Sequence, residues 1–314
     1  MIDEKNSKKR VAVVMSTYNG ERYLKEQIES VLRQTGVDVV LYIRDDGSTD
    51  GTRQILKQYE VLNQVSVTYG ENIGIGMSFM SLLLLLPDDY DAYAFSDQDD
   101  IWAQDKLQTA LCFLSKERGC VLYASNLEKV DADNHSQGLI FDQGQSFDFS
   151  LLSTIRSNKC YGCTQVFTRE LFQMLKARGE PEEVLRLRLH DSWLSVSAAA
   201  AGKILFDPKA HIRYRRHGGN YTSFDKGKAV LWKKRFYKIF HPGARNGGSK
   251  TALEVIRRYP EFVEKNADRE LILALADPRK LRNRAFLIRN RKRFVCQPNE
   301  SDFLFIVKVV AGWV

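Results

Sequence analysis

The stretch Val11-Ala12-Val13-Val14-Met15-Ser16-Thr17-Tyr18-Asn19-Gly20 decides the class of fold. It begins with an unbroken apolar run, a pattern that predicts a strand buried on both faces of a parallel sheet. The polar residues that follow, with a glycine at their end, predict a loop at the carboxyl end of this strand. Ligands of open α/β sheets bind beyond the carboxyl ends of the strands, so this loop is the first candidate for a binding site.

The order of strand, polar loop and helix repeats along the following residues. Apolar positions at spacings of three and four predict the first helix, and the later strands again end in polar loops. We expect helices over 23–32, 52–59 and 77–86, and strands at 39–43, 65–69 and 90–96. Such alternation is typical of right-handed βαβ units, and it predicts an α/β fold with a mostly parallel, Rossmann-like central sheet.

The pattern becomes less regular after the last of these strands. We expect strands at 121–125, 160–168, 204–206 and 212–214, a mostly irregular segment over 131–158 and a helix over 190–201. The charged residues 1–10 predict a flexible tail. A change to helices with basic faces places a boundary near residue 222, so that 11–222 forms one domain and 223–314 a basic, mainly helical C-terminal region.

Positive charge is concentrated in this C-terminal region. The segment from Lys226 to Arg293 holds 20 cations and 6 acids, whereas the whole chain of 314 residues has 47 cations and 39 acids. The remainder of the chain is therefore net acidic. Such asymmetry predicts that the C-terminal region meets an anionic partner.

Cysteines and apolar runs indicate the compartment. The cysteine count is odd, and Cys160 and Cys163 lack the second pair that a zinc site needs, so we expect buried thiols in a reducing compartment. No window reaches the roughly 18–20 apolar residues of a membrane span, and the run Val11–Met15 is too short for a signal peptide. We expect a cytoplasmic protein, either soluble or peripheral on the inner face of the cell membrane.

Asp97-Gln98-Asp99, with Asp100 beside it, follows an apolar strand directly. Several carboxylates on one short turn repel one another unless a cation or a sugar hydroxyl holds them together. Mg²⁺ and Mn²⁺ take one or two carboxylates together with substrate phosphate oxygens, so this turn is a candidate metal site. The alternative is a solvated acidic turn in which Asp100 caps a helix beginning at Ile101.

Three further clusters of polar residues lie at the end of an expected strand or at the start of an expected helix. Asp45 to Asp50 contains more polar side chains than a helix cap needs, and the surplus carboxylates can accept hydrogen bonds from a base or a ribose. His190-Asp191 opens a helix, where an Asp could also be a cap. The segment Tyr214 to Asn220 follows the last expected strand; its arginines could bind a pyrophosphate, although a lone His217 is more often structural.

In this order and at these separations, the clusters resemble family 2 glycosyltransferases of the GT-A fold, and among them bacterial cell-surface rhamnosyltransferases. The resemblance covers roughly residues 11–222 and implies a GT-A catalytic domain with a C-terminal extension. The matching motifs are Ser16-Thr17-Tyr18-Asn19-Gly20, Asp45-Asp46-Gly47-Ser48-Thr49-Asp50, Asn72-Ile73-Gly74, Ser96-Asp97-Gln98-Asp99-Asp100-Ile101-Trp102, His190-Asp191-x-Trp193 and Tyr214-Arg215-x-His217-Gly218-x-Asn220.

The resemblance also implies the activity and the roles of residues. It implies a hexosyltransferase that inverts the anomeric centre and uses Mg²⁺ or Mn²⁺, with dTDP-rhamnose as the first candidate donor and a saccharide or lipid-linked acceptor. Asp191 would be the catalytic base, with the role of His190 open, and Asp99, Asp97 and His217 would bind the metal. The donor-binding residues would be Thr17, Tyr18, Asn19, Asp45, Asp46, Asn72, Gly74, Asp97 and Arg215. Tyr18 would face the pyrimidine, and Asp46 would accept a hydrogen bond from the N3–H group of this base.

Other functions remain open at this point. A UDP-hexose donor would need the same pyrimidine-reading residues. The basic C-terminal region, with Trp232 among its cations, is compatible with nucleic-acid binding, but the acidic clusters elsewhere disfavour that partner. A binding module without activity would lack a metal-binding or base carboxylate, and all are present. The same region, including Lys233, Arg289 and Phe303–Val314, is also compatible with an anionic membrane surface or a homo-oligomer contact.

Overall fold

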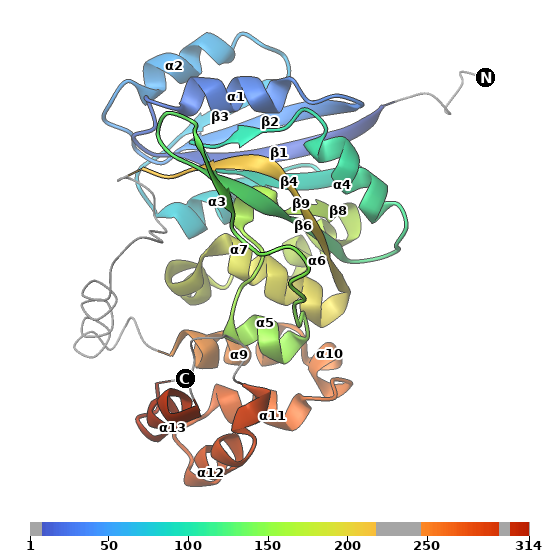
Figure 1. Ribbon diagram of the computed structural model, residues 1–314, viewed down its shortest axis with the longest axis vertical. Helices are drawn as coiled ribbons and strands as arrows, with labels where there is room; N and C mark the ends of the chain where they lie inside the picture. Colours follow the sequence, from blue (N-terminus) through green and yellow to red (C-terminus); the bar gives the residue numbers. More distant parts are fainter. Residues whose placement is uncertain (1–7, 218–245, 295–301, 314) are drawn as a thin grey trace.

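The computed structural model describes residues 8–217, 246–294 and 302–313. A mixed sheet stands at the centre, with helices on both faces and a group of C-terminal helices at one pole (Figure 1). The strands are β1 (Lys9–Thr17), β2 (Val37–Asp45), β3 (Val65–Tyr69), β4 (Ala92–Ser96), β5 (Ile101–Trp102), β6 (Val121–Val130), β7 (Ser136–Leu139), β8 (Val166–Thr168) and β9 (Lys203–Arg215). The order in the sheet is β3-β2-β1-β4-β8-β6-β9-β5, and β7 pairs with β6.

The helices belong to two layers and the C-terminal group. Their bounds are α1 (Leu24–Leu32), α2 (Thr52–Tyr59), α3 (Ile75–Leu85), α4 (Lys106–Leu114), α5 (Leu151–Arg156), α6 (Arg169–Arg178), α7 (Glu182–Ala201), α9 (Gly247–Arg258), α10 (Pro260–Glu264), α11 (Arg269–Ala276), α12 (Leu281–Arg289) and α13 (Asp302–Val310), with short 3-10 turns at Gly162–Thr164 and Arg291–Arg293. Helices α1, α2 and α4 cover one face of the sheet, and α3, α5, α6 and α7 cover the other.

Strand β1 explains why the sheet has a hydrophobic core on each face. Val11, Val13 and Met15 pack into the core under α1 and α4, whereas Ala12 and Val14 pack into the core under α3 and α7. All five side chains are fully buried. Because each buried aliphatic side chain contributes about 1.5–3 kcal/mol, this strand anchors both layers, as the apolar run predicts.

Antiparallel strands join the parallel strands that the sequence predicts. Strands β3, β2, β1 and β4 are parallel, and so are β6 and β9, but β8 runs antiparallel to both β4 and β6. Strands β5 and β7 are also antiparallel to their partners. The fold is therefore a mixed α/β sheet, with its parallel half formed by the regular βαβ units.

Some expected elements are placed differently in the structure. Ile101–Trp102 form strand β5 rather than a helix, because Oδ1 of Asp100 accepts the backbone N–H of Arg215 at 3.1 Å and draws this segment to β9. The two short strands expected at 204–206 and 212–214 are one strand, β9. Its register with β6 shifts between Asp207 and Ala210. Segment 131–158, expected to be irregular, contains β7 and α5, and β1 begins at Lys9.

The C-terminal helices pack on the helical layer beneath the sheet. The Tyr259 hydroxyl donates to Oγ of Ser197 in α7 at 2.9 Å, and Arg258 donates to the Glu180 carbonyl at 3.0 Å. Helices α9 and α11 share their hydrophobic core with α3 and α7. The part of the basic region around Trp232 and Lys233 lies outside the described residues. No helix in the described ranges is long and apolar enough to cross a membrane.

Candidate active site

Three neighbouring parallel strands end at one edge of the sheet. Thr17, at the end of β1, lies beside Asp45 at the end of β2, and Met15 lies beside Ser96 at the end of β4. Asp97 follows Ser96 directly. Residues that the sequence predicts to bind a donor therefore meet at the carboxyl edge of the sheet, where open α/β folds bind ligands.

The loop after β1 is tied to its neighbours by hydrogen bonds from side chains to the backbone. Oδ1 of Asn19 accepts the N–H of Thr49 at 2.8 Å, and Oγ of Ser48 accepts the N–H of Asn19 at 3.0 Å. The Gln98 side chain binds the N–H and the carbonyl of Tyr18, at 2.9 and 3.1 Å. Tyr18 is 48% exposed. Asn19 thus holds the loop after β1 against the loop after β2, while the side chain of Tyr18 is accessible to a ligand.

Asp45 is fully buried, and both of its carboxylate oxygens accept hydrogen bonds. Oδ1 lies 3.4 Å from the hydroxyl of Thr17, and Oδ2 accepts the N–H of Ser48 at 3.2 Å and Nε of Arg53 at 2.7 Å. This network fixes the turn that follows β2. The two predicted residues Thr17 and Asp45 are in contact.

Asp46 binds the loop that precedes α3. Its two carboxylate oxygens accept the N–H groups of Ile73 and Gly74, each at 3.0 Å, and the carboxylate is paired with the guanidinium of Arg44. A carboxylate offers about four acceptor positions, so three of them are taken here. Gly74 has φ +87°, which favours glycine, and Asn72 lies exposed beside it. Asp46 therefore stabilises the loop to which Asn72 and Gly74 belong.

The acidic turn after β4 contacts the segment after β9. Nε2 of His217 lies 2.8 Å from Oδ2 of Asp99, and both side chains are mostly buried. Two ligands at adjacent corners around Mg²⁺ are about 3 Å apart, because each lies about 2.1 Å from the ion. The structure thus brings together Asp99 and His217 at a spacing that fits a shared divalent cation.

Arg215 supports this turn from within the protein. Its Nε donates to the carbonyl of Asp99 at 3.1 Å, and its two terminal nitrogens bind the Ala132 carbonyl at 3.0 Å and the Glu26 carboxylate at 2.5 Å. The guanidinium also lies over the ring of Tyr23, at 4.6 Å. All three nitrogens are engaged, so Arg215 holds the position of Asp99 in this structure.

Asp97 lies among like charges. Burial, together with the carboxylates of Asp99 and Asp191, raises the pKa of Asp97 to about 7. Like charges without a counter-ion disfavour ionisation of one another, and a divalent cation reverses that preference. The charge of Asp191 also acts on Asp97, so the two carboxyl groups lie near each other although they are about a hundred residues apart in sequence.

Asp191 stands at a break in α7. Leu189, two residues before it, has φ +66° and ψ 170°, values that are nearly restricted to glycine. The helix restarts after this break, and Oδ1 of Asp191 accepts the N–H of Ser192 at 2.7 Å. Burial raises the pKa of Asp191 to about 6. A carboxyl group with such a pKa can accept a proton at neutral pH, as a general base must.

Asn158 fixes the second oxygen of this carboxylate. Its Nδ2 donates to Oδ2 of Asp191 at 2.9 Å, and its Oδ1 accepts the N–H of Cys160 at 3.0 Å and the Ser195 hydroxyl at 3.0 Å. Gln165 donates to the Asp191 carbonyl from the opposite side, also at 3.0 Å. Sequence reasoning missed Asn158 and Gln165, since they lie far from Asp191 in the chain and carry no motif.

The side chain of His190, unlike that of the neighbouring Asp191, packs against aromatic rings. Its ring stacks on Phe79 with centroids 3.8 Å apart and lies edge-on to Phe95 at 4.6 Å. Neither ring nitrogen has a hydrogen-bond partner among the described residues, and burial lowers the pKa of His190 to about 3. His190 is therefore a neutral packing residue, which answers the question that the sequence leaves open.

A second group of titratable residues lies directly behind the acidic turn. The ligand atoms of Asp97, Asp100 and Cys163 lie within 4.8 Å of one another, and Oδ2 of Asp100 is buried without a hydrogen-bond partner in the described part of the chain. Lys106 is fully buried 3.6 Å from the Trp102 ring centroid, and burial lowers its pKa to about 7. The expectation of buried thiols is confirmed for Cys160 and Cys163, which are both buried, and burial raises the pKa of Cys163 well above its usual value.

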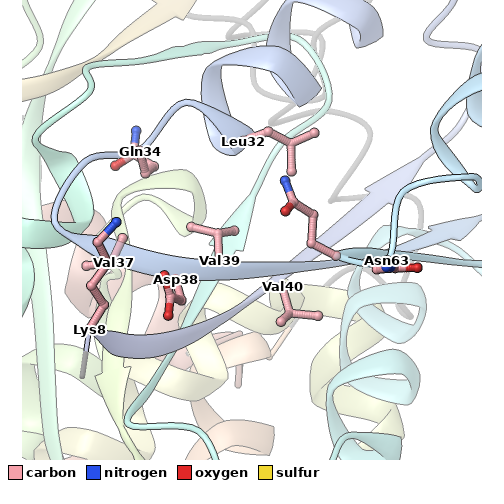
Figure 2. Close-up of a pocket in the computed structure, with 9 residues that line it drawn as sticks. Lys8, Leu32, Gln34, Val37, Asp38, Val39, Val40 and Asn63 are labelled. Atoms are coloured by element: carbon pink, nitrogen blue, oxygen red, sulfur yellow. The ribbon is translucent and has the colours of Figure 1, made fainter.

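A pocket of about 460 Å³ lies at the opposite edge of the sheet (Figure 2). It is formed by the amino-terminal ends of β1, β2 and β3 and the end of α1, away from the candidate carboxylates. The residues that line it are Lys8, Leu32, Gln34, Val37, Asp38, Val39, Val40, Asn63 and Gln64. Since only Lys8 and Asp38 are charged, we place no catalytic site there.

Comparison with known proteins defines the class. Residues 12–174 match the family model described as glycosyl transferase family 2, and the chain therefore belongs to this family. It is 30% identical over 238 residues to dTDP-rhamnosyl transferase RfbG of Shigella flexneri, which covers 72% of this chain and 78% of that protein. Family membership makes the protein a glycosyltransferase, and the nucleic-acid-binding alternative loses its support.

Solved structures show the same fold. The crystal structure of S. aureus TarS 1-349 superposes with a TM-score of 0.59 at 20% identity, covering 96% of this chain and 87% of that one. The mannosyltransferase PcManGT from Pyrobaculum calidifontis, solved with GDP-Man and Mn²⁺, gives a TM-score of 0.50 at 18% identity, covering 98% and 81%. The expected GT-A fold with a helical C-terminal extension is confirmed.

Proposed function

We propose that this chain is an inverting, metal-dependent rhamnosyltransferase that moves L-rhamnose from dTDP-rhamnose to a saccharide or lipid-linked acceptor in cell-surface polysaccharide biosynthesis. The observation that carries the proposal is the proximity of Asp191 to the acidic turn: the ligand atoms of Cys163 and Asp97 lie within 4.8 Å of each other, and the adjacent Gly162 packs against Asp191. The similarity to RfbG supports rhamnose as the sugar. We place the reaction in the cytoplasm, at the inner face of the cell membrane.

Asp191 acts as the general base in this proposal. It removes the proton from an acceptor hydroxyl while the hydroxyl oxygen attacks the anomeric carbon, and the bond from that carbon to the diphosphate breaks. The proton ends on Asp191, and the electron pair of the broken bond leaves with the nucleoside diphosphate. Direct displacement inverts the anomeric centre. Asn158 keeps the carboxylate oriented throughout, through its hydrogen bond of 2.9 Å.

Asp99, His217 and Asp97 would hold Mg²⁺ or Mn²⁺. The oxygen-rich donor set suits either ion, and the raised pKa of Asp97 reflects the uncompensated charge that a cation relieves. When bound, the cation offsets the negative charge that develops on the leaving diphosphate. Arg215 would also serve this reaction by fixing the carbonyl of Asp99.

Tyr18 and the loops around it would bind the nucleotide. The exposed Tyr18 would stack on the pyrimidine, with Thr17, Asn19 and Asp45 shaping the loops on which it stands. Asp46 has one acceptor position left for the N3–H of a thymine or uracil. Because both bases offer this group, a UDP-hexose donor is the second candidate function.

A donor panel tests the proposal. Release of nucleoside diphosphate is measured for dTDP-rhamnose, UDP-glucose, UDP-galactose and a GDP-sugar, with Mg²⁺, Mn²⁺ or EDTA. We expect the highest turnover with dTDP-rhamnose and a metal, and little turnover in EDTA. Preference for a UDP-sugar would replace rhamnose with a hexose, and undiminished activity in EDTA would contradict the metal assignment.

A further inference from the structure

Helix α12 presents an unusual outer face at the pole of the molecule farthest from α2 (Figure 1). Leu281 is 78% exposed and Phe286 is 37% exposed. Arg282 and Arg289 are exposed on the same helix at spacings that place them beside these apolar residues. Leu287 is buried on the opposite side of the helix. The outer face of α12 is thus both apolar and cationic.

The segment that contains α12 carries an excess of positive charge. Residues 278–294 contain eight Lys or Arg and no Asp or Glu. Three of the cations are paired with carboxylates elsewhere: Lys280 with Asp277, Arg291 with Asp302, and Arg293 with Asp268. Four exposed cations have no carboxylate partner within the described ranges: Arg279, Arg282, Arg289 and Lys292.

Helix α13 adds a second apolar stripe next to α12. Phe303, Val307 and Val310 are 75%, 39% and 56% exposed, and their spacing of four and three places them on one face of the helix. Phe305 and Val309 are fully buried on the other face. Gly312, just after α13, lies beside the guanidinium of Arg284 in α12, so the two helices are neighbours.

We propose that α12 and α13 form a docking surface for an anionic membrane. A second copy of the chain would bring the cations without a carboxylate partner on one α12 against those on the other, which Coulomb repulsion disfavours. A nucleic acid would pair with the arginines but would leave Leu281, Phe303 and Val310 in water. An anionic lipid surface satisfies both features, since apolar side chains enter the interface while cations meet the headgroups. Residues 218–245 are themselves basic in sequence and are no counter-charge for this face.

This surface is separate from the carboxyl edge of the sheet, so the inference does not depend on which sugar is transferred. Each Lys or Arg near an anionic leaflet raises membrane affinity about fivefold. Reversing Arg282, Arg289 and Lys292 should therefore weaken binding by about 100-fold or more. Such docking would hold the catalytic domain where lipid-linked acceptors lie.

Sedimentation with vesicles tests the proposal. The full chain is mixed with vesicles of phosphatidylcholine alone, or of phosphatidylcholine with phosphatidylglycerol. Three proteins are compared: the wild type, the variant R282E/R289E/K292E, and a control variant K57E/K116E/R118E with the same net charge but with its exposed cations elsewhere. We expect the wild type and the control to bind only the anionic vesicles, and the α12 variant to stay in the supernatant.

A second pair of substitutions tests the apolar contribution. Leu281→Ser with Phe303→Ser keeps every charge, and both side chains are exposed, so the fold should be unaffected. We expect weaker binding to anionic vesicles and unchanged donor hydrolysis. Equal vesicle binding by the α12 variant and the control would overturn the proposal. The proposal would also be overturned if the wild type formed a dimer in solution and the α12 variant dissociated it. It would be overturned as well if the wild type bound DNA and the two serine substitutions left that binding unchanged.

Discussion

Two acidic turns lie at the carboxyl edge of the sheet, one on each side of β1, and their carboxylates have different surroundings. In the turn after β2, Asp45 and Asp46 accept hydrogen bonds from four backbone or side-chain partners and are paired with Arg53 and Arg44. In the turn after β4, Asp97 and Asp100 have raised pKa values, because they are buried among other carboxylates. Oδ2 of Asp100 lacks a partner in the described structure.

Protein donors satisfy the carboxylates of the turn after β2, whereas we propose that a cation compensates those of the turn after β4. A buried carboxylate with several donors stabilises the loops that surround it. A buried carboxylate beside others is unfavourable until a cation compensates the charge. Both turns are rich in Asp in the sequence, and they differ in the donors around them. The donors to Asp45 and Asp46 come from nearby residues such as Arg44 and Arg53 and from the distant loop of Ile73 and Gly74. We therefore assign the turn after β2 to structure and nucleotide binding, and the turn after β4 to the metal.

The largest effect is expected at Asp191, whose charge acts on the turn after β4. Asp191→Asn should lower sugar transfer by about 10²–10⁴-fold, since the amide keeps the shape but cannot accept the proton. Donor binding should be retained, as judged by calorimetry with dTDP. Asp38→Asn, an exposed carboxylate at the opposite edge, is the matched control. Near wild-type transfer by Asp191→Asn would place the base elsewhere.

Asn158 should give the next effect, because it orients Asp191 without touching the substrate. Loss of its hydrogen bond to a charged group costs about 1.5–3 kcal/mol, so Asn158→Ala should lower kcat roughly 10- to 100-fold. The KM for the donor should change little. Asn158→Asp should not restore the rate, as it replaces the donating amide with a second carboxylate. A rise in KM with unchanged kcat would assign Asn158 to donor binding instead.

Substitutions of Asp46 and Asp99 test the difference between the two turns through the free energy of unfolding. Asp46→Ala leaves the N–H groups of Ile73 and Gly74 and the buried Arg44 without their acceptor, which should lower the free energy of unfolding by about 1–3 kcal/mol. Asp99→Ala removes a charge from the crowded turn and should not lower it. Urea unfolding without metal measures both. Equal destabilisation by the two substitutions would remove the distinction between the turns.

The pH dependence of stability tests the turn after β4 in a second way. Between pH of about 4 and 7 the folded protein keeps a proton on Asp97 that the unfolded chain releases, because the folded pKa is raised to about 7. The stability contributed by Asp97 is therefore present at low pH and is lost as pH rises through this window. Asp97→Asn should flatten this decline in metal-free urea titrations. An unchanged slope would assign the pH dependence to other groups.

The regular half of the fold can be predicted from sequence because its elements contact their sequence neighbours. Helix α2 and strand β3 have the expected bounds, Thr52–Tyr59 and Val65–Tyr69. Strand β9 could not be predicted as one strand, since Pro208 interrupts its pattern and the register with β6 shifts there. Strand β5 depends on a hydrogen bond between Asp100 and Arg215, which are distant in sequence.

The candidate site could likewise be predicted from the sequence only in part. The acidic motifs identify Asp97, Asp99 and Asp191, because each follows or opens a regular element. The partners that give these carboxylates their properties come from irregular or distant segments, and they include Asn158 and the buried Lys106. Neither forms a pattern in the sequence. The assignment of Arg215 to the diphosphate stays a prediction, since its three nitrogens bind protein groups here.

Thermal unfolding with Mn²⁺ and dTDP tests the central claim that the turn after β4 is the metal site. A ligand at 100 times its dissociation constant stabilises a protein by about 2.7 kcal/mol, which raises the Tm by several degrees. We predict this rise for the wild type and for Asp38→Ala, and its loss with EDTA or in Asp99→Ala. The same Mn²⁺-dependent rise in Asp99→Ala as in the wild type would contradict the account.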